Sequence, residues 1–287
     1  MAKAQVLALH EEAIVDAAWL IGRLDDPAVR VVEVDVTGAR YQQGHIPGAV
    51  LWNAYTDLHH SDYSPIERDE LESLLSESGI SATTTVVFYG YAPYLGFWVM
   101  KSLGHDRVRV LGVSRETWVG GGYPWMTDVA QVARSTYALP AGPPTSFASL
   151  ESTWAAISDP HQLILDVRSR AEFDGDRFWP SGASEGAGRP GHIPGAIHLP
   201  IELMRADDGL FRSSEDIRKL TDEMGISPVR TVTTYCTIGG RATEAWFVLT
   251  HLLGFPDVRV YVGSWANWGT RADTPVETDE KRGQQVG

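Results

Sequence analysis

The amino-acid sequence predicts an α/β protein built from two homologous domains, and three observations support this prediction. The hexapeptide GHIPGA occurs at residues 44–49 and again at residues 191–196. The surrounding segments also match, since LLSESGISATTTVVFYG (74–90) aligns with LTDEMGISPVRTVTTYC (220–236) without a gap. In each half, short aliphatic runs alternate with charged amphipathic segments, which is typical of a mostly parallel sheet flanked by helices. We therefore expect the same α/β unit twice.

The first half contains four short β-branched and aliphatic runs, which indicate buried parallel strands. GHIPGA should turn the chain after the first of them, because proline fixes φ there. The charged segment 66–77 is expected to form a helix that ends near Gly79, and a second helix should follow the third strand. The four expected strands span residues 31–34, 49–52, 84–89 and 108–111.

The second half repeats this order of elements. A charged helix is expected at 214–224, ending near Gly225, and another helix should end at Gly254. The expected strands span residues 163–167, 196–199, 230–235 and 258–262. The last helix is indicated by apolar residues with a period of 3.6, at Ala245, Val248, Leu249, Leu252 and Leu253.

A proline-containing segment separates the two halves. We place the first domain at residues 1–132, a linker at 133–147 and the second domain at 148–287. The linker sequence ARSTYALPAGPPTSF has no amphipathic period, so it is predicted to be extended and exposed. The polar sequence from residue 273 to the C-terminus has no pattern and is predicted to fray.

The net charge of −13 limits the classes of partner. A nucleic-acid-binding protein would carry a basic stripe, and an anionic membrane surface would repel this chain. The N-terminal sequence predicts neither a signal peptide nor a membrane span. A single cysteine excludes an internal disulfide and cysteine-rich zinc sites, so we expect a cytoplasmic protein without a metal or organic cofactor.

That cysteine, Cys236, stands directly after an expected strand, in the loop CTIGGR (236–241) that opens a helix. Sites in open α/β sheets usually lie beyond the carboxyl ends of the strands. Backbone N–H groups of a glycine-containing loop at a helix start bind anions, and Arg241 adds positive charge, so this loop favours a nucleophilic thiolate. An inert, buried cysteine is the alternative, but the loop context favours a reactive thiol.

The first half lacks these features at the aligned positions. Gly90 stands where the second half has Cys236, and Thr37 stands where it has Arg168. Pro93 also removes one N–H donor from the corresponding loop. We expect the first domain to be a catalytically silent copy.

At this point the sequence resembles a known family over nearly its whole length. The two GHIPGA turns, the cysteine loop in the second half only, and the late motif Gly263-Ser264-Trp265-x-x-Trp268 are similar to tandem-domain rhodanese sulfurtransferases. The resemblance implies that Cys236 takes the sulfane sulfur of thiosulfate, or of 3-mercaptopyruvate, as a persulfide. Cyanide or a thiol then accepts this sulfur in a ping-pong reaction. A monomer is expected, since the two domains can pair within one chain.

The resemblance also implies roles for individual residues. The loop N–H groups of Thr237, Ile238, Gly239, Gly240 and Arg241 would stabilise the persulfide anion. Arg168, Arg177 and Arg189 are candidates for contacting the anionic donor, which favours thiosulfate. For Arg168, an ion pair with a neighbouring carboxylate is the alternative.

The sequence departs from the family pattern at three positions. Thr237 and Ile238 are neither the basic residues typical of loops that favour thiosulfate nor the small residues typical of those that favour mercaptopyruvate. Glu172 stands where some relatives have a second arginine. The insert at 173–190 holds Arg177 and Arg189, and it is either a functional cover over the cysteine loop or a solvated surface loop.

Several repeated residues have structural roles in our interpretation. His45 and His192 occur in both copies of GHIPGA and should stabilise the turn through hydrogen bonds. Asp35 and Asp166 also occur in both halves. Trp265 and Trp268 are expected to pack in the core or at its rim.

Two other classes of function also use a reactive cysteine. A dual-specificity cysteine phosphatase needs five residues between the cysteine and the arginine of its loop, and Arg241 comes one residue too early after Cys236. A non-enzymatic sulfur carrier or redox sensor would also use a reactive cysteine. Multiple turnovers with excess donor and acceptor would distinguish an enzyme from a sulfur carrier or a redox sensor.

Overall fold

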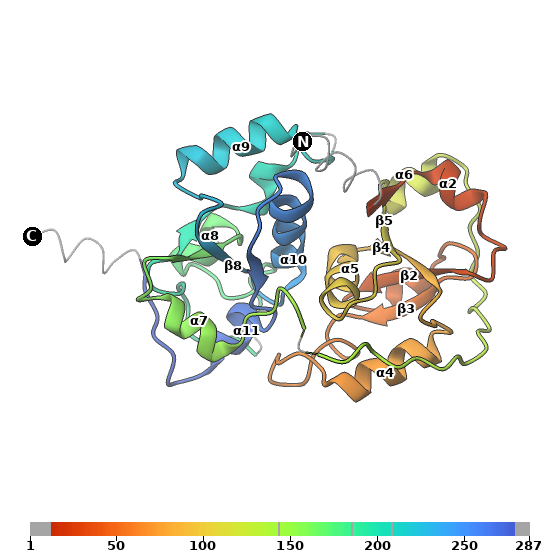
Figure 1. Cartoon of the computed structure of the whole chain (residues 1–287), viewed down its shortest axis with the longest axis horizontal. Helices are drawn as coiled ribbons and strands as arrows, with labels where there is room; N and C mark the ends of the chain where they lie inside the picture. Colours follow the sequence, from red (N-terminus) through yellow and green to blue (C-terminus); the bar gives the residue numbers. More distant parts are fainter. Residues whose placement is uncertain (1–12, 143, 185, 208, 279–287) are drawn as a thin grey trace, which may run out of the picture. The chain divides into compact units, whose positions relative to one another are not determined.

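The chain folds into two compact units, each built around its own sheet (Figure 1). A computed structural model describes residues 13–142, 144–184, 186–207 and 209–278. The first unit extends to Thr145 and the second begins at Ser146, so the division falls inside the predicted linker. Three residues of the first half, Asp62–Ser64, belong to the second unit. The expectations for residues 1–12 and 279–287 lie outside the described residues.

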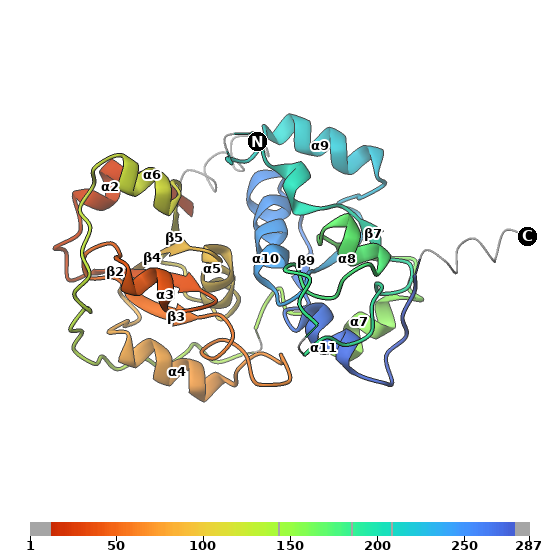
Figure 2. The same ribbon diagram turned by 180° about the vertical axis from the view of Figure 1, so that it is seen from behind.

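The first unit contains a five-stranded parallel sheet with strand order β1-β5-β4-β2-β3. Helices cover both faces of this sheet, since α5 lies in front of it in Figure 1 and α3 lies in front of it in Figure 2. The strands are β1 (Ile14–Val15), β2 (Val29–Asp35), β3 (Val50–Asn53), β4 (Thr85–Gly90) and β5 (Val108–Leu111). The helices are α2 (Ala17–Ile21), α3 (Ala39–Gln42), α4 (Arg68–Glu77), α5 (Pro93–Ser102) and α6 (Arg115–Gly120).

The second unit contains a four-stranded parallel sheet with strand order β7-β6-β8-β9. Its strands are β6 (Gln162–Asp166), β7 (Ile197–His198), β8 (Thr231–Tyr235) and β9 (Val258–Val260). Its helices are α7 (Leu150–Ala156), α8 (Arg170–Asp174), the 3₁₀ helix η1 (Ile201–Met204), α9 (Ser214–Glu223), α10 (Gly240–Phe247), the π-helix η2 (Val248–Leu252) and α11 (Ser264–Thr270). All eight predicted strands are therefore present, and the α/β fold is confirmed twice.

The two sheets correspond strand by strand. Ile14 of β1 pairs with Val110 of β5, and Phe147 forms a parallel bridge with Val260 of β9 in the equivalent place. The short elements β1, α2, α3, α6, α7, α8, η1 and α11 were not predicted. Most of them are too short to show a hydrophobic period.

The predicted structural role of the GHIPGA histidines is confirmed. The ring Nδ1 of His45 lies 3.0 Å from the carbonyl of Tyr41, and that of His192 lies 2.8 Å from the carbonyl of Phe173. His192 also exchanges two backbone hydrogen bonds with Glu277. The prediction that the chain frays from residue 273 is therefore wrong as far as Glu277, because this segment pairs with the turn.

The predicted linker is extended, but it is not fully exposed. The N–H of Ser135 donates to the carbonyl of Ser76, and the N–H of Leu139 donates to Oε1 of Glu72, so this segment follows α4. Tyr137 and Leu139 are buried. Alternate residues of an extended chain face one side, and here that side packs against the first unit.

The centre of the second sheet positions the candidate site. β8 lies between β6 and β9, and α10 packs alongside β8 and β9 (Figure 1). The core beneath it contains Tyr235, Trp265 and Trp268, which confirms the expected packing role of the two tryptophans. In the described part of the chain, no helix is long and apolar enough to cross a membrane.

Candidate functional site

Cys236 follows β8 directly, at the carboxyl end of the central strand, where the sequence places it. The residue is buried, and the N–H of Gly239 donates to its Sγ at 3.2 Å. Gly239 has φ of +94° and precedes the first turn of α10. A Cβ at this position would lie 2.9 Å from the carbonyl oxygen of Val262, so glycine is required where the loop turns its N–H towards the sulfur.

The start of α11 fixes the backbone of the nucleophile. The N–H of Cys236 donates to Oγ of Ser264 at 3.1 Å, and the N–H of Trp265 donates to the carbonyl of Cys236 at 3.0 Å. The N–H of Ala266 donates to the carbonyl of Thr237 at 2.9 Å. Ser264 has φ of +53°, a conformation that is costly for a residue with a Cβ. Such strain is expected where a side chain must be held at a reactive group.

Arg241 is engaged by a carboxylate rather than free to bind an anion. Its Nη1 and Nη2 donate to the two oxygens of Glu172 at 2.9 and 2.7 Å. The hydroxyl of Thr237 donates to Glu172 at 2.6 Å and accepts from Arg241 at 2.7 Å. Glu172 also caps α8, accepting from the N–H and hydroxyl of Ser169. These contacts join the cysteine loop to α8.

The charges of this cluster stabilise each other. Burial alone would raise the pKa of Glu172, but the hydrogen bonds and charge of Arg241, together with Thr237 and Ser169, lower this pKa to about 2. Burial opposes the charged form of Arg241, while Glu172 and the sulfur of Cys236 raise the pKa of its guanidinium. Both side chains therefore stay ionised at neutral pH, and the net charge of the pair is close to zero.

Arg168 forms the ion pair that the sequence left as the alternative to substrate binding. Its side chain is fully buried, and its Nε and Nη2 bind the carboxylate of Asp166 at 2.7 to 3.1 Å. Burial works against the charge of Arg168, but Asp166 and Tyr235 raise the pKa of its guanidinium. The guanidinium lies over the ring of Trp265 at 4.6 Å. This geometry favours the ion-pair alternative over a contact with the donor.

The insert 173–190 packs in part against α11, whereas its described residues from 180 to 187 are exposed. Phe178 and Trp179 are buried in the core of the second unit. Arg189 donates to the carbonyls of Trp268 and Thr274 at 3.4 and 2.8 Å, beyond the C-terminal end of α11, where a cation is favoured. Arg177 is exposed and donates to the carbonyl of Pro180 at 3.2 Å. Neither arginine has a contact with the cysteine loop among the described interactions.

Of the residues predicted for the site, the loop from Cys236 to Arg241 therefore forms one connected group, and the three other arginines serve elsewhere. Within the loop, the side chains of Ile238 and Arg241 remain partly exposed. Sequence reasoning missed the part played by Glu172, although the spacing S-x-x-E at 169–172 is that of a capping box.

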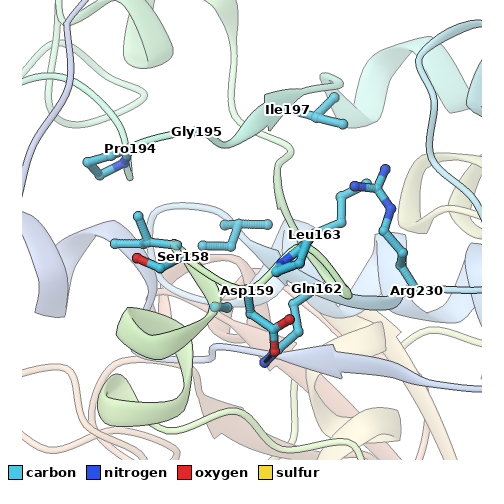
Figure 3. Close-up of a pocket in the computed structure, with 12 residues that line it drawn as sticks. Ser158, Asp159, Gln162, Leu163, Pro194, Gly195, Ile197 and Arg230 are labelled. Atoms are coloured by element: carbon cyan, nitrogen blue, oxygen red, sulfur yellow. Dashed lines mark hydrogen bonds between the residues drawn. The ribbon is translucent and has the colours of Figure 1, made fainter.

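A hollow of about 310 Å³ in the second unit is separate from this site. Its lining includes Ser158, Asp159 and Gln162 at the amino end of β6, Pro194 and Gly195 of the turn, and Arg230 (Figure 3). Cys236 lies at the opposite, carboxyl end of the strands. Within the described ranges, no group of three or more His, Cys, Asp or Glu residues could hold a metal ion.

Comparison with known proteins defines the class of this chain. The model of the rhodanese-like domain matches twice, at residues 16–120 and 149–271. The chain therefore belongs to the rhodanese family, with two such domains in tandem.

Individual relatives are similar over almost their whole length. The chain is 36% identical to the sulfur carrier protein TtuD of Thermus thermophilus, over 95% of this chain and 99% of that protein. It is 35% identical to a protein of Haloferax volcanii named "Putative thiosulfate sulfurtransferase", over 93% of this chain and 96% of that protein.

Solved structures show the same fold. The anaerobic ergothioneine biosynthesis enzyme of Chlorobium limicola, in complex with trimethyl histidine, matches with a TM-score of 0.81 and 26% identity. The match covers 94% of this chain and 71% of that enzyme. A structure of an EanB variant with a cysteine persulfide and ergothioneine matches with a TM-score of 0.80 and 26% identity, over 94% of this chain and 71% of that one.

Proposed function

We propose that this protein is a sulfurtransferase that moves the sulfane sulfur of thiosulfate to a thiophilic acceptor, cyanide or a thiol, through a persulfide on Cys236. The observation that carries the proposal is the thiol at the end of β8 with the N–H of Gly239 directed at its sulfur, 3.2 Å away. Membership of the rhodanese family and a relative named as a thiosulfate sulfurtransferase support it.

In the loading step, the Cys236 thiolate attacks the outer sulfur of thiosulfate. A new S–S bond forms, the bond between the two sulfurs of thiosulfate breaks, and its electron pair leaves with sulfite. The product is the persulfide anion Cys236–S–S⁻. Backbone N–H groups of the loop would stabilise this anion, and that of Gly239 already points towards the sulfur before the reaction.

In the transfer step, cyanide or a thiolate attacks the outer sulfur of the persulfide. The S–S bond to Cys236 breaks and its electron pair returns to the Cys236 sulfur, so the enzyme is regenerated as the thiolate. The acceptor leaves as thiocyanate or as a persulfide of its own. Sulfite leaves before the acceptor reacts and the enzyme alternates between thiolate and persulfide forms, so ping-pong kinetics are expected.

A second donor, 3-mercaptopyruvate, is favoured by one observation. Thiosulfate carries two negative charges, whereas the carboxylate of mercaptopyruvate carries one. Glu172 compensates the charge of Arg241, and Asp166 compensates that of Arg168. A site with little uncompensated positive charge gives a dianion less advantage over a monoanion.

A carrier that is loaded once and passes its sulfur to a protein would use the same persulfide. The name of the Thermus thermophilus relative supports this alternative. Turnover distinguishes the two, because an enzyme cycles with excess donor and acceptor.

The experiment that tests the proposal is the intact mass of the reduced protein after brief incubation with thiosulfate or with 3-mercaptopyruvate. We expect the gain of one sulfur atom, its loss on addition of cyanide, and no gain in Cys236→Ser. The donor that loads faster identifies the substrate. If neither donor adds sulfur to folded, reduced protein, the proposal is wrong.

A further inference from the structure

Three residues of the first half are built into the second unit, where they contact the start of α11. Asp62–Ser64 belong to the second unit, although the rest of the chain up to Thr145 belongs to the first. The side-chain Nδ2 of Asn267 donates to the carbonyl of Asp62 at 2.8 Å. The carbonyl oxygen of Tyr63 lies against Gly263, where an added Cβ would be 3.1 Å away. The segment is therefore seated on the start of α11.

The start of α11 binds both this segment and the backbone of the nucleophile. Ser264 and Trp265 hold the backbone of Cys236, and they stand between Gly263 and Asn267, the two residues that hold Asp62 and Tyr63. Asn267 is itself fixed, because its Oδ1 accepts from the hydroxyl of Tyr261 at 2.7 Å. Tyr63 is thus linked to Cys236 through the start of α11, although the two residues are far apart in the sequence.

Tyr63 adopts a backbone conformation that tyrosine seldom takes. Its φ is +65°, in the left-handed region that is costly for a residue with a bulky side chain. Residues in such conformations persist where their surroundings fix them, and they gather at functional sites. Ser264, which follows Gly263 in the sequence, also has a positive φ.

The side chain of Tyr63 forms part of an aromatic surface. Its ring lies 5.7 Å from that of Trp179, at an angle of 54°, within the range of favourable aromatic contacts. Trp179 comes from the insert at 173–190 and is buried in the core of the second unit. Ile238, a partly exposed side chain of the cysteine loop, packs against the same cluster as Tyr63. Tyr63 and Ile238 are therefore partly exposed members of one aromatic and aliphatic group in which Trp179 is buried, and carboxylates compensate the guanidinium groups of Arg241 and Arg168.

We propose that Tyr63 is a specificity-determining residue for the sulfur acceptor, and that with Trp179 and Ile238 it favours thiols with a flat, apolar body over small anions. The proposal rests on the persulfide route of the proposed function. The acceptor thiolate attacks the outer sulfur of Cys236–S–S⁻, the S–S bond breaks, and its electron pair returns to Cys236. Tyr63 contributes by contact with the acceptor body, and it takes no part in the bond changes.

The test compares two acceptors on the sulfur-loaded full-length protein, thiophenol and cyanide, with wild type, Tyr63→Ala and Tyr63→Phe. We expect Tyr63→Ala to raise the ratio of the KM for thiophenol to the KM for cyanide by about tenfold, since an aromatic contact is worth up to about 1.5 kcal/mol. Tyr63→Phe keeps the ring and should restore the wild-type ratio. Tyr91→Ala is the matched control, because Tyr91 is an exposed tyrosine of the first unit, 61% accessible.

The outcomes separate this inference from the proposed function. If wild type does not gain sulfur from either donor, the proposed function fails. If wild type gains sulfur and Tyr63→Ala leaves the KM ratio at the Tyr91→Ala value, Tyr63 does not recognise the acceptor. A loss of kcat with both acceptors and an unchanged KM ratio would also overturn the inference. Tyr63→Leu, which keeps an apolar body without the ring, provides the same comparison if Tyr63→Ala is not folded.

Discussion

Glu172 binds both terminal nitrogens of Arg241, at 2.9 and 2.7 Å, beside the loop that begins with Cys236. This pair changes the electrostatics expected from the sequence, in which Arg241 adds positive charge that favours the thiolate. With the guanidinium compensated, the donor that the structure shows at the sulfur is the N–H of Gly239, at the start of α10. The charge state of Glu172 should therefore control which donor is preferred.

Replacing Glu172 by Gln should improve the use of thiosulfate. The amide has the size of the carboxylate and can still accept from Arg241, but it removes one negative charge near the bound donor. We expect the KM for thiosulfate to fall by about tenfold and that for 3-mercaptopyruvate to fall less, because the attraction scales with the charge of the ligand. Steady-state kinetics with cyanide as acceptor at neutral pH would measure both.

The matched control is Asp174→Asn, which removes a carboxylate from the same helix, α8. Asp174 pairs with Arg170 at 2.6 Å on the outer side of the helix. Its loss should leave both KM values unchanged. Equal effects of the two substitutions would mean that Glu172 acts only through the net charge of the protein.

The same carboxylate should make stability depend on acidic pH. The pKa of Glu172 is lowered to about 2, below its ordinary value, so its ionised form stabilises the fold. This contribution, about 3 kcal/mol, is fully present above the ordinary value and is lost as pH falls through about 2. We expect the difference in the free energy of unfolding between wild type and Glu172→Gln to shrink by this amount between pH 6 and pH 2.

Urea titrations of the two proteins at matched pH values would measure this difference. Glu244, whose pKa is raised by burial, acts in the opposite sense, but it is present in both proteins and cancels. A difference that stays constant from pH 6 to pH 2 would contradict the prediction.

Substitution of Arg168 should affect the free energy of unfolding more than it affects substrate binding. Arg168 and Asp166 are both fully buried, so Arg168→Met leaves an uncompensated carboxylate in the core and should cost about 3–5 kcal/mol. The double variant Asp166→Asn, Arg168→Met removes both charges and should recover much of this loss. Denaturant unfolding measures both. A raised KM for thiosulfate without a loss of stability would instead support the substrate role.

The fold could be predicted from the sequence because each half repeats the same pattern. Strand runs such as 31–34 and 163–167 are buried on both faces, so they appear as mainly aliphatic segments, each with one acidic residue. The path of the linker could not be predicted in the same way. Tyr137 and Leu139 are buried through contacts with His105 and with Glu72 of α4, and these contacts join segments distant in the sequence.

The site could be predicted in part, for a similar reason. Cys236 and its loop are contiguous, so strand, loop and helix order were sufficient to locate them. The partners of the arginines are not contiguous. Glu172 and Arg241 form an ion pair although they are distant in the sequence. Tyr63 contacts α11 because Asp62–Ser64, which come from the first half of the chain, belong to the second unit. Such pairings need the folded chain.

The strained residue Ser264 offers a final prediction, because its hydroxyl holds the N–H of Cys236 while its backbone has φ of +53°. Ser264→Ala leaves that buried N–H without an acceptor, which should cost about 1–3 kcal/mol and slow sulfur loading, since small displacements of a reacting atom are costly. Ser264→Gly loses the same hydrogen bond but relieves the backbone strain, so it should be about 1 kcal/mol more stable than Ser264→Ala. Denaturant unfolding and the rate of mass gain with thiosulfate would test both variants. Wild-type loading rates in both would show that the hydroxyl does not position the nucleophile.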